Sequence, residues 1–235
     1  MSSITSANVA CGFHGGDPNV MRLTVRLAKQ HRVAVGAHPG LPDLVGFGRR
    51  EMKVSPREIE DMFLYQIGAL AAIAAAEGVR LQHVKAHGAL YNMTSQEPEL
   101  AAAIARAVAA FDKSLILLGL PESPMVRAGE KAGLRTAAEV FADRAYDADG
   151  SLTSRKKAGS VIHDPDTVVA RAVRMVREGG VVATDGSWVK LKVDTICTHG
   201  DTPGAHDLVR RLRAALESNG VTVGAIGAAP SISAS

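Results

Sequence analysis

Residues 8–18 read Asn8-Val9-Ala10-Cys11-Gly12-Phe13-His14-Gly15-Gly16-Asp17-Pro18, and an apolar run turns there into a polar, glycine-rich corner. The apolar run predicts the end of a strand. Asp17 can cap a helix, and Pro18 suits the first helical position because its missing N–H would have no partner there. The glycines permit positive φ angles and a close approach to a ligand. We therefore expect a strand, a functional corner and a helix in that order, with His14 pointing out of the corner.

The same order recurs along the chain. A capping residue precedes proline again at Ser55-Pro56, Ser123-Pro124 and Asp164-Pro165, and Glu58 completes a capping box with Ser55. Strands are expected over residues 6–11, 32–37, 81–85, 114–120, 136–141, 188–194, 195–198 and 221–226. Helices are expected over 18–30, 55–78, 97–111, 164–177 and 205–219, with a further helix opening at Pro124. Repeated βα units predict a parallel sheet covered by helices.

Length and composition favour one α/β domain. The chain has 235 residues, of which 46% are hydrophobic and only 4% aromatic, as expected of helices packed on a parallel sheet. No linker divides it. Parallel βα units build either a barrel or an open doubly wound sheet, and of the two we expect a (β/α) barrel-like fold of TIM type over residues 1–229, with a disordered tail over 230–235. Neither GxGxxG after the first strand nor GxxxxGK[ST] occurs, so neither a Rossmann nucleotide site nor a P-loop is predicted.

Charge and cysteine content exclude several classes of protein. The formal charge is +3, but basic residues are scattered among acidic ones, which argues against a nucleic-acid partner. Cys11 and Cys197 both fall at strand ends, where we expect them to be reduced and buried rather than bridged. No apolar run reaches the length of a membrane span, and no basic-then-apolar leader is seen, so no membrane association is expected and the expected compartment is the cytoplasm.

Reactive side chains gather after the predicted strands. They are His14, His38, Lys85, His87, Asp143, Arg144, His199 and Asp201. The carboxyl ends of parallel strands meet on one face, so we expect these side chains to converge. Lys85 and His87 lie two residues apart and leave the strand on the same side, where they could polarise a carbonyl and move a proton.

Other interpretations of these residues stay open. A histidine at a strand end is often a structural residue, and Asp143 next to Arg144 is equally consistent with an ordinary ion pair. Asp201, two residues beyond His199, could orient that ring or act as a base. The histidines could also ligate a divalent metal, although no HxxxH or HExxH spacing indicates one.

The chain resembles the LamB/YcsF family almost from end to end. Six blocks carry the likeness in order: SANVACGFHGGDP (6–18), GAHP (36–39) with FGR (47–49), LYQIGAL (64–70), HVKAHGALYN (83–92), EVFADRAY (139–146) and ICTHGD (196–201). The resemblance implies a (β/α) barrel-like fold of the deacetylase-like superfamily. It also implies the role of the A component of 5-oxoprolinase, which takes part in ATP-dependent, hydrolytic opening of the 5-oxoproline lactam to L-glutamate, with subunits B and C as partners.

The resemblance also implies roles for single residues. Lys85 and Arg144 would stabilise negative charge on oxygen, and His87, His199 and Asp201 would manage the proton on nitrogen, with Asp143 in the same catalytic set. The substrate would be held by Asn8, His14, His38, Arg49 and Tyr91. ATP would be the co-substrate, with Mg²⁺; a protein-bound divalent metal and a homo-oligomer are left open. Two other functions remain: a stand-alone metal-dependent amidase or deacetylase, and a non-catalytic lactam-binding subunit.

The chain departs from the family pattern at two places. Ala86 stands where the family usually has proline, a change that could loosen the corner holding Lys85 and His87. Family members usually begin with a strand that ends in an Asp-Leu-Asn-x-Asp-x-Gly-Glu type loop, and this chain begins after it. We therefore expect a barrel without its first strand, from either a mis-assigned start codon or an impaired protein, which the mass of the native product would decide.

Overall fold

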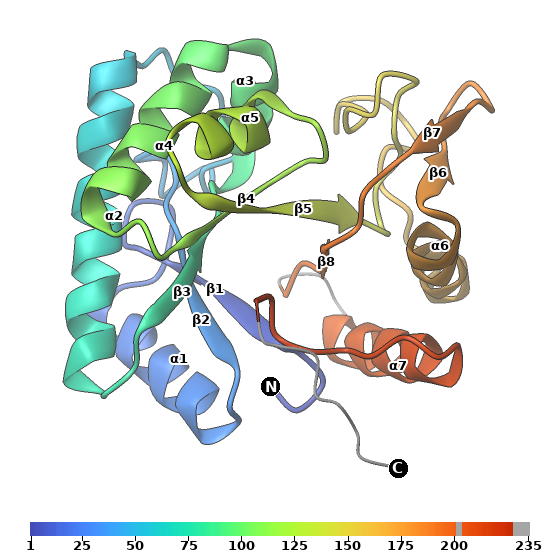
Figure 1. The fold of residues 1–235 in the computed structure, drawn as a ribbon, viewed down its shortest axis with the longest axis horizontal. Helices are drawn as coiled ribbons and strands as arrows, with labels where there is room; N and C mark the ends of the chain where they lie inside the picture. The colour runs from blue at the N-terminus through green and yellow to red at the C-terminus, as the bar shows by residue number, and fades with distance from the viewer. Residues whose placement is uncertain (201–203, 228–235) are drawn as a thin grey trace.

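The computed structural model describes residues 1–200 and 204–227, and its centre is a six-stranded parallel sheet (Figure 1). The strands lie in the order β1-β2-β3-β4-β5-β8, so that each βα unit advances the sheet in one direction. They are β1 (Ser6–Ala10), β2 (Ala34–His38), β3 (Leu81–Val84), β4 (Ile116–Gly119), β5 (Arg135–Phe141) and β8 (Thr195–Cys197). The sheet curls into a half-barrel, which confirms the predicted barrel-like α/β class. Among the described residues, β1 and β8 form its two edges.

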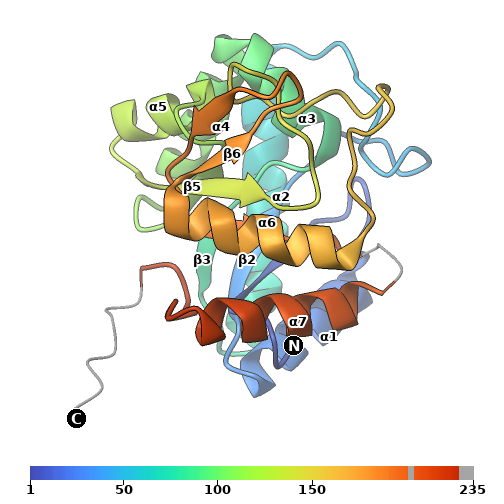
Figure 2. The ribbon, with the colours of Figure 1, turned by 90° about the vertical axis from the view of Figure 1, so that its right-hand side faces the viewer.

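Seven helices surround the sheet in the described part of the chain. They are α1 (Pro18–Gln30), α2 (Pro56–Ala76), α3 (Gly88–Gln96), α4 (Pro98–Phe111), α5 (Pro124–Lys131), α6 (Pro165–Glu178) and α7 (Ala205–Ser218). Helices α1, α2 and α4 lie on one side of the sheet, and α6 lies above α7 on the other (Figure 2). The predicted caps form: Asp17 accepts from the N–H groups of Asn19 and Val20, and Ser55 makes a complete capping box with Glu58.

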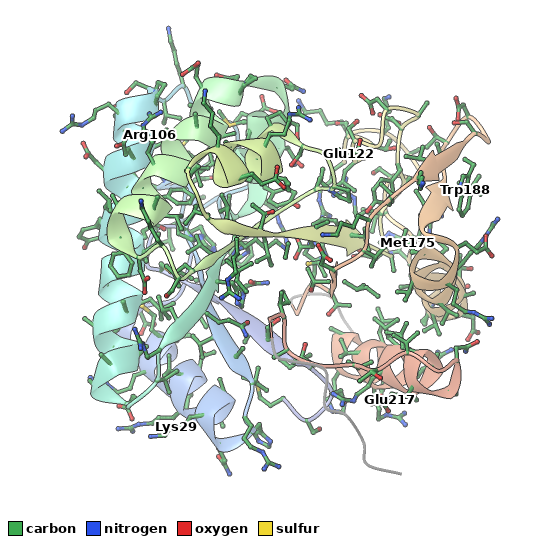
Figure 3. All side chains as sticks on the ribbon, in the orientation of Figure 1. Lys29, Arg106, Glu122, Met175, Trp188 and Glu217 are labelled. Carbon is green, nitrogen blue, oxygen red and sulfur yellow. The ribbon has the colours of Figure 1, made fainter. Side chains whose placement is uncertain are left out.

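The main core lies between the sheet and α1, α2 and α4. Val25, Phe63, Ile67, Ile104 and Leu117 are fully buried there, and each such side chain contributes roughly 1.5–3 kcal/mol through burial. A smaller cluster joins α6 to α7 through Val168, Ala172, Leu212 and Leu216, next to Ala142. Side chains fill the space between helices and sheet, whereas Lys29, Arg106 and Glu217 lie on outer faces (Figure 3).

Helix α2 is long and apolar. By length and composition alone it could cross a membrane, with a mean hydropathy of 1.4, so the expectation that no segment reaches that length is not met. Core helices pass the same test. Ile59, Phe63 and Leu70 are fully buried against the rest of the molecule, and we interpret α2 as a helix of the protein core.

Three local predictions are corrected by the structure. The alternating segment expected over 188–194 is a strand only at β7 (Trp188–Lys190), which pairs antiparallel with β6 (Gly180–Val182) in a separate hairpin. No strand forms over 221–226; instead Val221 and Val223 pack on the α6–α7 cluster, and Ile226 packs on β4 and β5. Residues 88–96, for which no helix was expected, form α3. The tail predicted over 230–235 lies outside the described residues.

Candidate functional site

A cavity of about 1210 Å³ reaches the carboxyl ends of the strands. The residues that line it come from β1, β2, β4, β5 and β8, from the loops that follow the strands, from helix α7 and from residues 1–5 and 221–226. They include these predicted site residues: Asn8, His14, His38, Arg49, Lys85, His87, Tyr91, Arg144 and His199. Asp143 lies directly behind His199, and Asp201 lies outside the described residues. The predicted convergence is therefore observed for side chains that are up to 191 positions apart in the sequence.

Three histidine rings from three strand ends form one cluster. The His14 ring stacks on the His87 ring with centroids 3.6 Å apart and planes at 4°. His38 meets His87 edge-on, and the two are joined by a contact of 3.0 Å between His87 Nδ1 and His38 Nε2. His14 is buried and its Nδ1 has no hydrogen-bond partner among the described residues, so His14 can present only Nε2 to the cavity. Burial, His87 and Arg49 lower the pKa of His14 to about 3.

The three contacts made by the His38 and His87 rings need one more N–H group than two neutral imidazole rings have. His38 Nδ1 lies 2.8 Å from the Lys85 carbonyl oxygen, and His87 Nε2 lies 2.7 Å from the Phe47 carbonyl oxygen. A carbonyl only accepts, so both of these nitrogens carry hydrogen, and the contact between the rings needs a third. Two neutral imidazoles carry two N–H groups in total. Burial, Lys85 and His87 lower the pKa of His38, so His38 is the neutral ring, and a third proton, where the pair holds one, resides on His87.

The loop that carries Phe47 is held against the histidine corner. The Asp43 carboxylate accepts from the N–H groups of Gly46 and Arg50 and pairs with the Arg50 guanidinium. These interactions lower the pKa of Asp43 to about 2, with the Arg50 hydrogen bond the largest cause. Ala89 N–H also donates to the Gly48 carbonyl oxygen at 2.9 Å. The loop therefore brings its Phe47 carbonyl to His87 as a fixed acceptor.

We expect Gly88→Ala to destabilise the protein by at least about 2 kcal/mol. Gly88 has a φ of +60°, and an added Cβ would lie 2.3 Å from the Gly48 carbonyl oxygen. Left-handed backbone alone costs an L-residue roughly 1–2 kcal/mol. Gly133→Ala is the matched control, because Gly133 has a φ of +76° but open space around it. Urea denaturation should show the larger loss for Gly88→Ala; equal losses would mean that the close approach of the two loops is not tight.

Lys85 forms a buried ion pair on the cavity floor. Its Nζ lies 2.8 Å from Oε1 and 2.7 Å from Oε2 of Glu139, and 3.0 Å from the Cys197 sulfur. Burial works against the ammonium, but the Glu139 carboxylate outweighs it and raises the pKa of Lys85, while the neutral Cys197 sulfur only accepts a hydrogen bond. Burial likewise raises the pKa of Cys197 to about 12, so this cysteine is a thiol. Both cysteines are free and buried, as predicted.

Aromatic rings enclose the lysine. Lys85 Nζ lies 4.9 Å from the Phe141 ring centroid and 5.6 Å from that of Tyr91. The Tyr91 hydroxyl is buried without a hydrogen-bond partner among the described residues. Burial and the Glu139 carboxylate raise the pKa of Tyr91 well above its usual value. The hydroxyl therefore stays protonated, next to the Glu139 carboxylate.

His199 and Asp143 form a second pair. His199 Nδ1 lies 3.0 Å from Asp143 Oδ2, and the His199 ring stacks on Phe141 at 5.9 Å. Asp143 Oδ1 is buried without a hydrogen-bond partner among the described residues. A carboxylate that accepts from Nδ1–H leaves Nε2 of the same ring free to take a proton. The geometry is therefore that of a carboxylate-oriented base.

Arg144 is placed differently from the sequence-based assignment. Its guanidinium donates from Nε to the Ser160 carbonyl oxygen at 3.1 Å and from Nη2 to the Thr153 carbonyl oxygen at 2.6 Å. Burial lowers its pKa. Arg144 does not form the ion pair with Asp143 that was one alternative; it fixes the loop that follows β5. Its predicted role in stabilising charge on oxygen stays a prediction.

Asn8 contacts the floor of the half-barrel. Its Oδ1 lies 2.9 Å from Nε2 of His83, which is completely buried above Gly36. An added Cβ at Gly36 would lie 2.0 Å from this ring nitrogen, so only glycine leaves room for the histidine. Burial and Lys85 lower the pKa of His83 to about 4.

His83 is expected to make the fold sensitive to acid. Between pH 6.5 and about 4 the unfolded histidine binds a proton and the folded one does not. The stability that this neutral ring contributes is complete above pH 6.5 and falls by about 1.4 kcal/mol for each pH unit below it. Urea denaturation at pH 7.5 and pH 5 should show a smaller loss in His83→Gln than in the wild type. Exposed His31→Gln is the control; an unchanged loss in both variants would contradict the buried neutral state.

The histidine corner directs its ring nitrogens at protein atoms rather than at a common point. His38 and His87 contact each other and two backbone carbonyls. Among residues 1–200 and 204–227, no group of three or more His, Cys, Asp or Glu side chains is arranged to hold a metal ion. A protein-bound metal therefore stays a prediction.

Two participants are absent from the sequence-based set of site residues. Glu139 is the only charged residue in the buried part of β5, and its spacing from Phe141 places both on one face of the strand, so this pattern could have indicated it. The role of the Phe47 carbonyl could not have been predicted, because every residue has a backbone carbonyl and the residue type does not indicate which one accepts a hydrogen bond.

Comparison with known proteins shows the family and the fold that this chain shares. The model of the LamB/YcsF family matches residues 1–231. The chain is 56% identical over 223 residues to a Pyrococcus abyssi protein named as the A subunit of 5-oxoprolinase, covering 95% of this chain and 88% of that protein. It is 56% identical over 228 residues to a protein of the same name from Symbiobacterium thermophilum, covering 97% and 87%. A crystal structure titled lactam utilization protein, from Thermus thermophilus, superposes with a TM-score of 0.90 at 53% identity, covering 95% of this chain and 90% of that one.

Proposed function

The chain belongs to the LamB/YcsF family, and from this membership we propose that it is the A component of an ATP-dependent 5-oxoprolinase. The reaction is hydrolysis of the cyclic amide C–N bond of 5-oxoproline to give L-glutamate, and the partners are two further subunits, B and C. We place the complex in the cytoplasm, in keeping with two free, buried cysteines.

One observation carries the proposal. A single cavity is lined by the hydrogen-bonded His38–His87 pair, a carboxylate-oriented histidine and a charged lysine, all from different strand ends. Opening a lactam needs a group that takes a proton from water and another that gives one to nitrogen. Both kinds of group face the same space here.

The lactam itself resists attack because amide resonance makes its carbonyl a poor electrophile. When bound with Mg²⁺, ATP would supply the phosphoryl group: its transfer to the carbonyl oxygen releases ADP and makes the ring carbon a better electrophile. Water addition and C–N cleavage then leave an acyl phosphate, and its hydrolysis by a second water releases phosphate and L-glutamate. The cavity volume of about 1210 Å³ exceeds that of ordinary small-ligand sites. It therefore has room for a co-substrate beside the small ring.

His199 is the base in this scheme. Asp143 Oδ2 accepts its Nδ1–H at 3.0 Å and leaves Nε2 unprotonated toward the cavity. A water that attacks the carbonyl carbon transfers its proton to this Nε2 as the C–O bond forms. The Asp143 carboxylate then stabilises the resulting imidazolium.

The His38–His87 pair is the acid. It carries one proton more than two neutral rings do, shared across a 3.0 Å contact. When the C–N bond breaks, the electron pair goes to nitrogen, and that nitrogen takes the proton. The lysine of the Lys85–Glu139 pair, enclosed by aromatic rings, supplies fixed positive charge beside the reacting carbonyl.

The proposed function is tested by omitting components one at a time. We expect glutamate to form from 5-oxoproline only when this chain, subunits B and C and ATP are all present. Glutamate formation by this chain alone with added divalent metal would instead identify a stand-alone amidase. Lactam binding by this chain, with every activity-abolishing substitution in the other subunits, would identify a non-catalytic binding component.

A further inference from the structure

The loop after β5 carries two cations into the cavity. Thr153 and Ser160 are buried, while the six residues between them are exposed. Of those six, Ser154, Arg155 and Lys156 line the cavity. Residues 153–160 are therefore anchored by their two buried ends, and the basic residues between these ends line the cavity.

The anchors fix where Arg155 can lie. Arg144 donates to the carbonyl oxygens of both Thr153 and Ser160, at 2.6 Å and 3.1 Å. Thr153 N–H donates to the Ala145 carbonyl oxygen, and Ala145 N–H donates to the Ser160 carbonyl oxygen. Arg155 is two residues beyond Thr153, so the buried guanidinium of Arg144 holds the backbone that presents it.

The charge of Arg155 is uncompensated. Among residues 1–200 and 204–227, its guanidinium makes no ion pair or hydrogen bond, and neither does the Lys156 ammonium. The neighbouring Lys157 instead faces Asp147, at 3.9 Å. Next to burial, the Arg155 charge lowers the pKa of Arg144, so the two guanidinium groups lie close enough to repel each other. The positive charges of Arg144 and Arg155 lie at the same wall of the cavity. They favour the binding of an anion in the cavity next to them.

We propose that Arg155, with Lys156 beside it, binds the anionic group of the substrate: a carboxylate such as that of 5-oxoproline, or a phosphate. The identity of the ligand in this proposal rests on the proposed function. A guanidinium matches either anion with two parallel hydrogen bonds, which a lysine ammonium cannot reproduce. Arg155 then positions the ring so that its amide faces His87 and His199, across the same cavity.

The test uses the reconstituted complex with Arg155→Ala, Arg155→Lys and the control Lys157→Ala. Lys157 lies on the same loop and carries the same charge, but it does not line the cavity. We expect Arg155→Ala to raise KM roughly 10- to 100-fold, the loss of a hydrogen bond to a charged group, with a much smaller change in kcat. Arg155→Lys should raise KM less than Arg155→Ala does, but still above the wild-type value. Lys157→Ala should keep KM within about twofold of that of the wild type.

The KM values for the two substrates identify the anion. A raised KM for 5-oxoproline with an unchanged KM for ATP assigns the carboxylate, and the reverse assigns the phosphate. Calorimetry on the isolated chain with 5-oxoproline, with 2-pyrrolidinone (the same ring without the carboxylate) and with inorganic phosphate tests binding even if the complex forms no glutamate. If Arg155→Ala and Lys157→Ala are indistinguishable in every titration, the proposal is overturned.

Discussion

Replacing Lys85 by methionine is expected to destabilise the protein by about 3–5 kcal/mol and to abolish glutamate formation by the complex. Lys85 Nζ contacts both carboxylate oxygens of Glu139, and both side chains are almost completely buried. Removing one partner of a buried pair leaves the other charge without compensation. The free energy of unfolding from urea denaturation measures the first effect, and 5-oxoproline-dependent glutamate formation measures the second.

The double variant Lys85→Met/Glu139→Leu separates stability from catalysis. Apolar side chains of similar volume replace a buried ion pair at little or no cost, so we expect most of the lost free energy to return. Activity should remain absent, because the positive charge at the cavity is still missing. A double variant as unstable as the single one would contradict the account of the ion pair, and an active double variant would remove Lys85 from the chemistry.

His87→Ala is expected to lower kcat by about 10²- to 10⁴-fold, the usual contribution of a positioned acid or base. Its ring makes the contacts to His38 Nε2 and to the Phe47 carbonyl that hold the extra proton. Exposed His31→Ala is the control for loss of a histidine elsewhere. Steady-state kinetics of the reconstituted complex gives the comparison, and a wild-type kcat for His87→Ala would exclude His87 as the acid.

The protonation of this pair has a direct readout. Three hydrogen bonds between two rings and two carbonyls need three N–H groups. The ¹⁵N shifts of His87 at neutral pH should therefore be those of an imidazolium, and His38 should be the neutral Nδ1–H tautomer. Two neutral rings at neutral pH would mean that one of the three contacts is not a hydrogen bond.

Much of the fold was predictable because its signals are local. Asp17, Ser55, Ser123 and Asp164 each cap the helix that begins at the next residue, as predicted. A cap needs only its own side chain and the N–H groups of the following turn. Strand ends could be predicted in the same way, from apolar runs that give way to polar residues. The convergence of His14, His38, Lys85, His87 and His199 then follows from parallel topology, without knowledge of any contact.

Predictions failed where the deciding partner is remote in sequence. Apolar and polar side chains do alternate over residues 188–194. Only residues 188–190 form a strand, because they pair with β6 in a hairpin. Residues 221–226 have the apolar content of a strand, yet they pack on α6, α7 and the sheet instead of pairing. A strand needs a neighbour with a free edge, and residue types alone do not say which edges are free.

The amino-acid sequence by itself determined the βα repeat, the starts of the capped helices and the end of the sheet at which reactive side chains gather, because each depends on interactions within a few residues. Only the tertiary structure decided what those side chains do to one another. Glu139 holds Lys85, Asp143 orients His199, and the Phe47 carbonyl contacts the His87 ring. These outcomes depend on distances of about 3 Å between residues from different strands, and on burial that makes an unpaired charge costly. Neither quantity exists until the chain has folded.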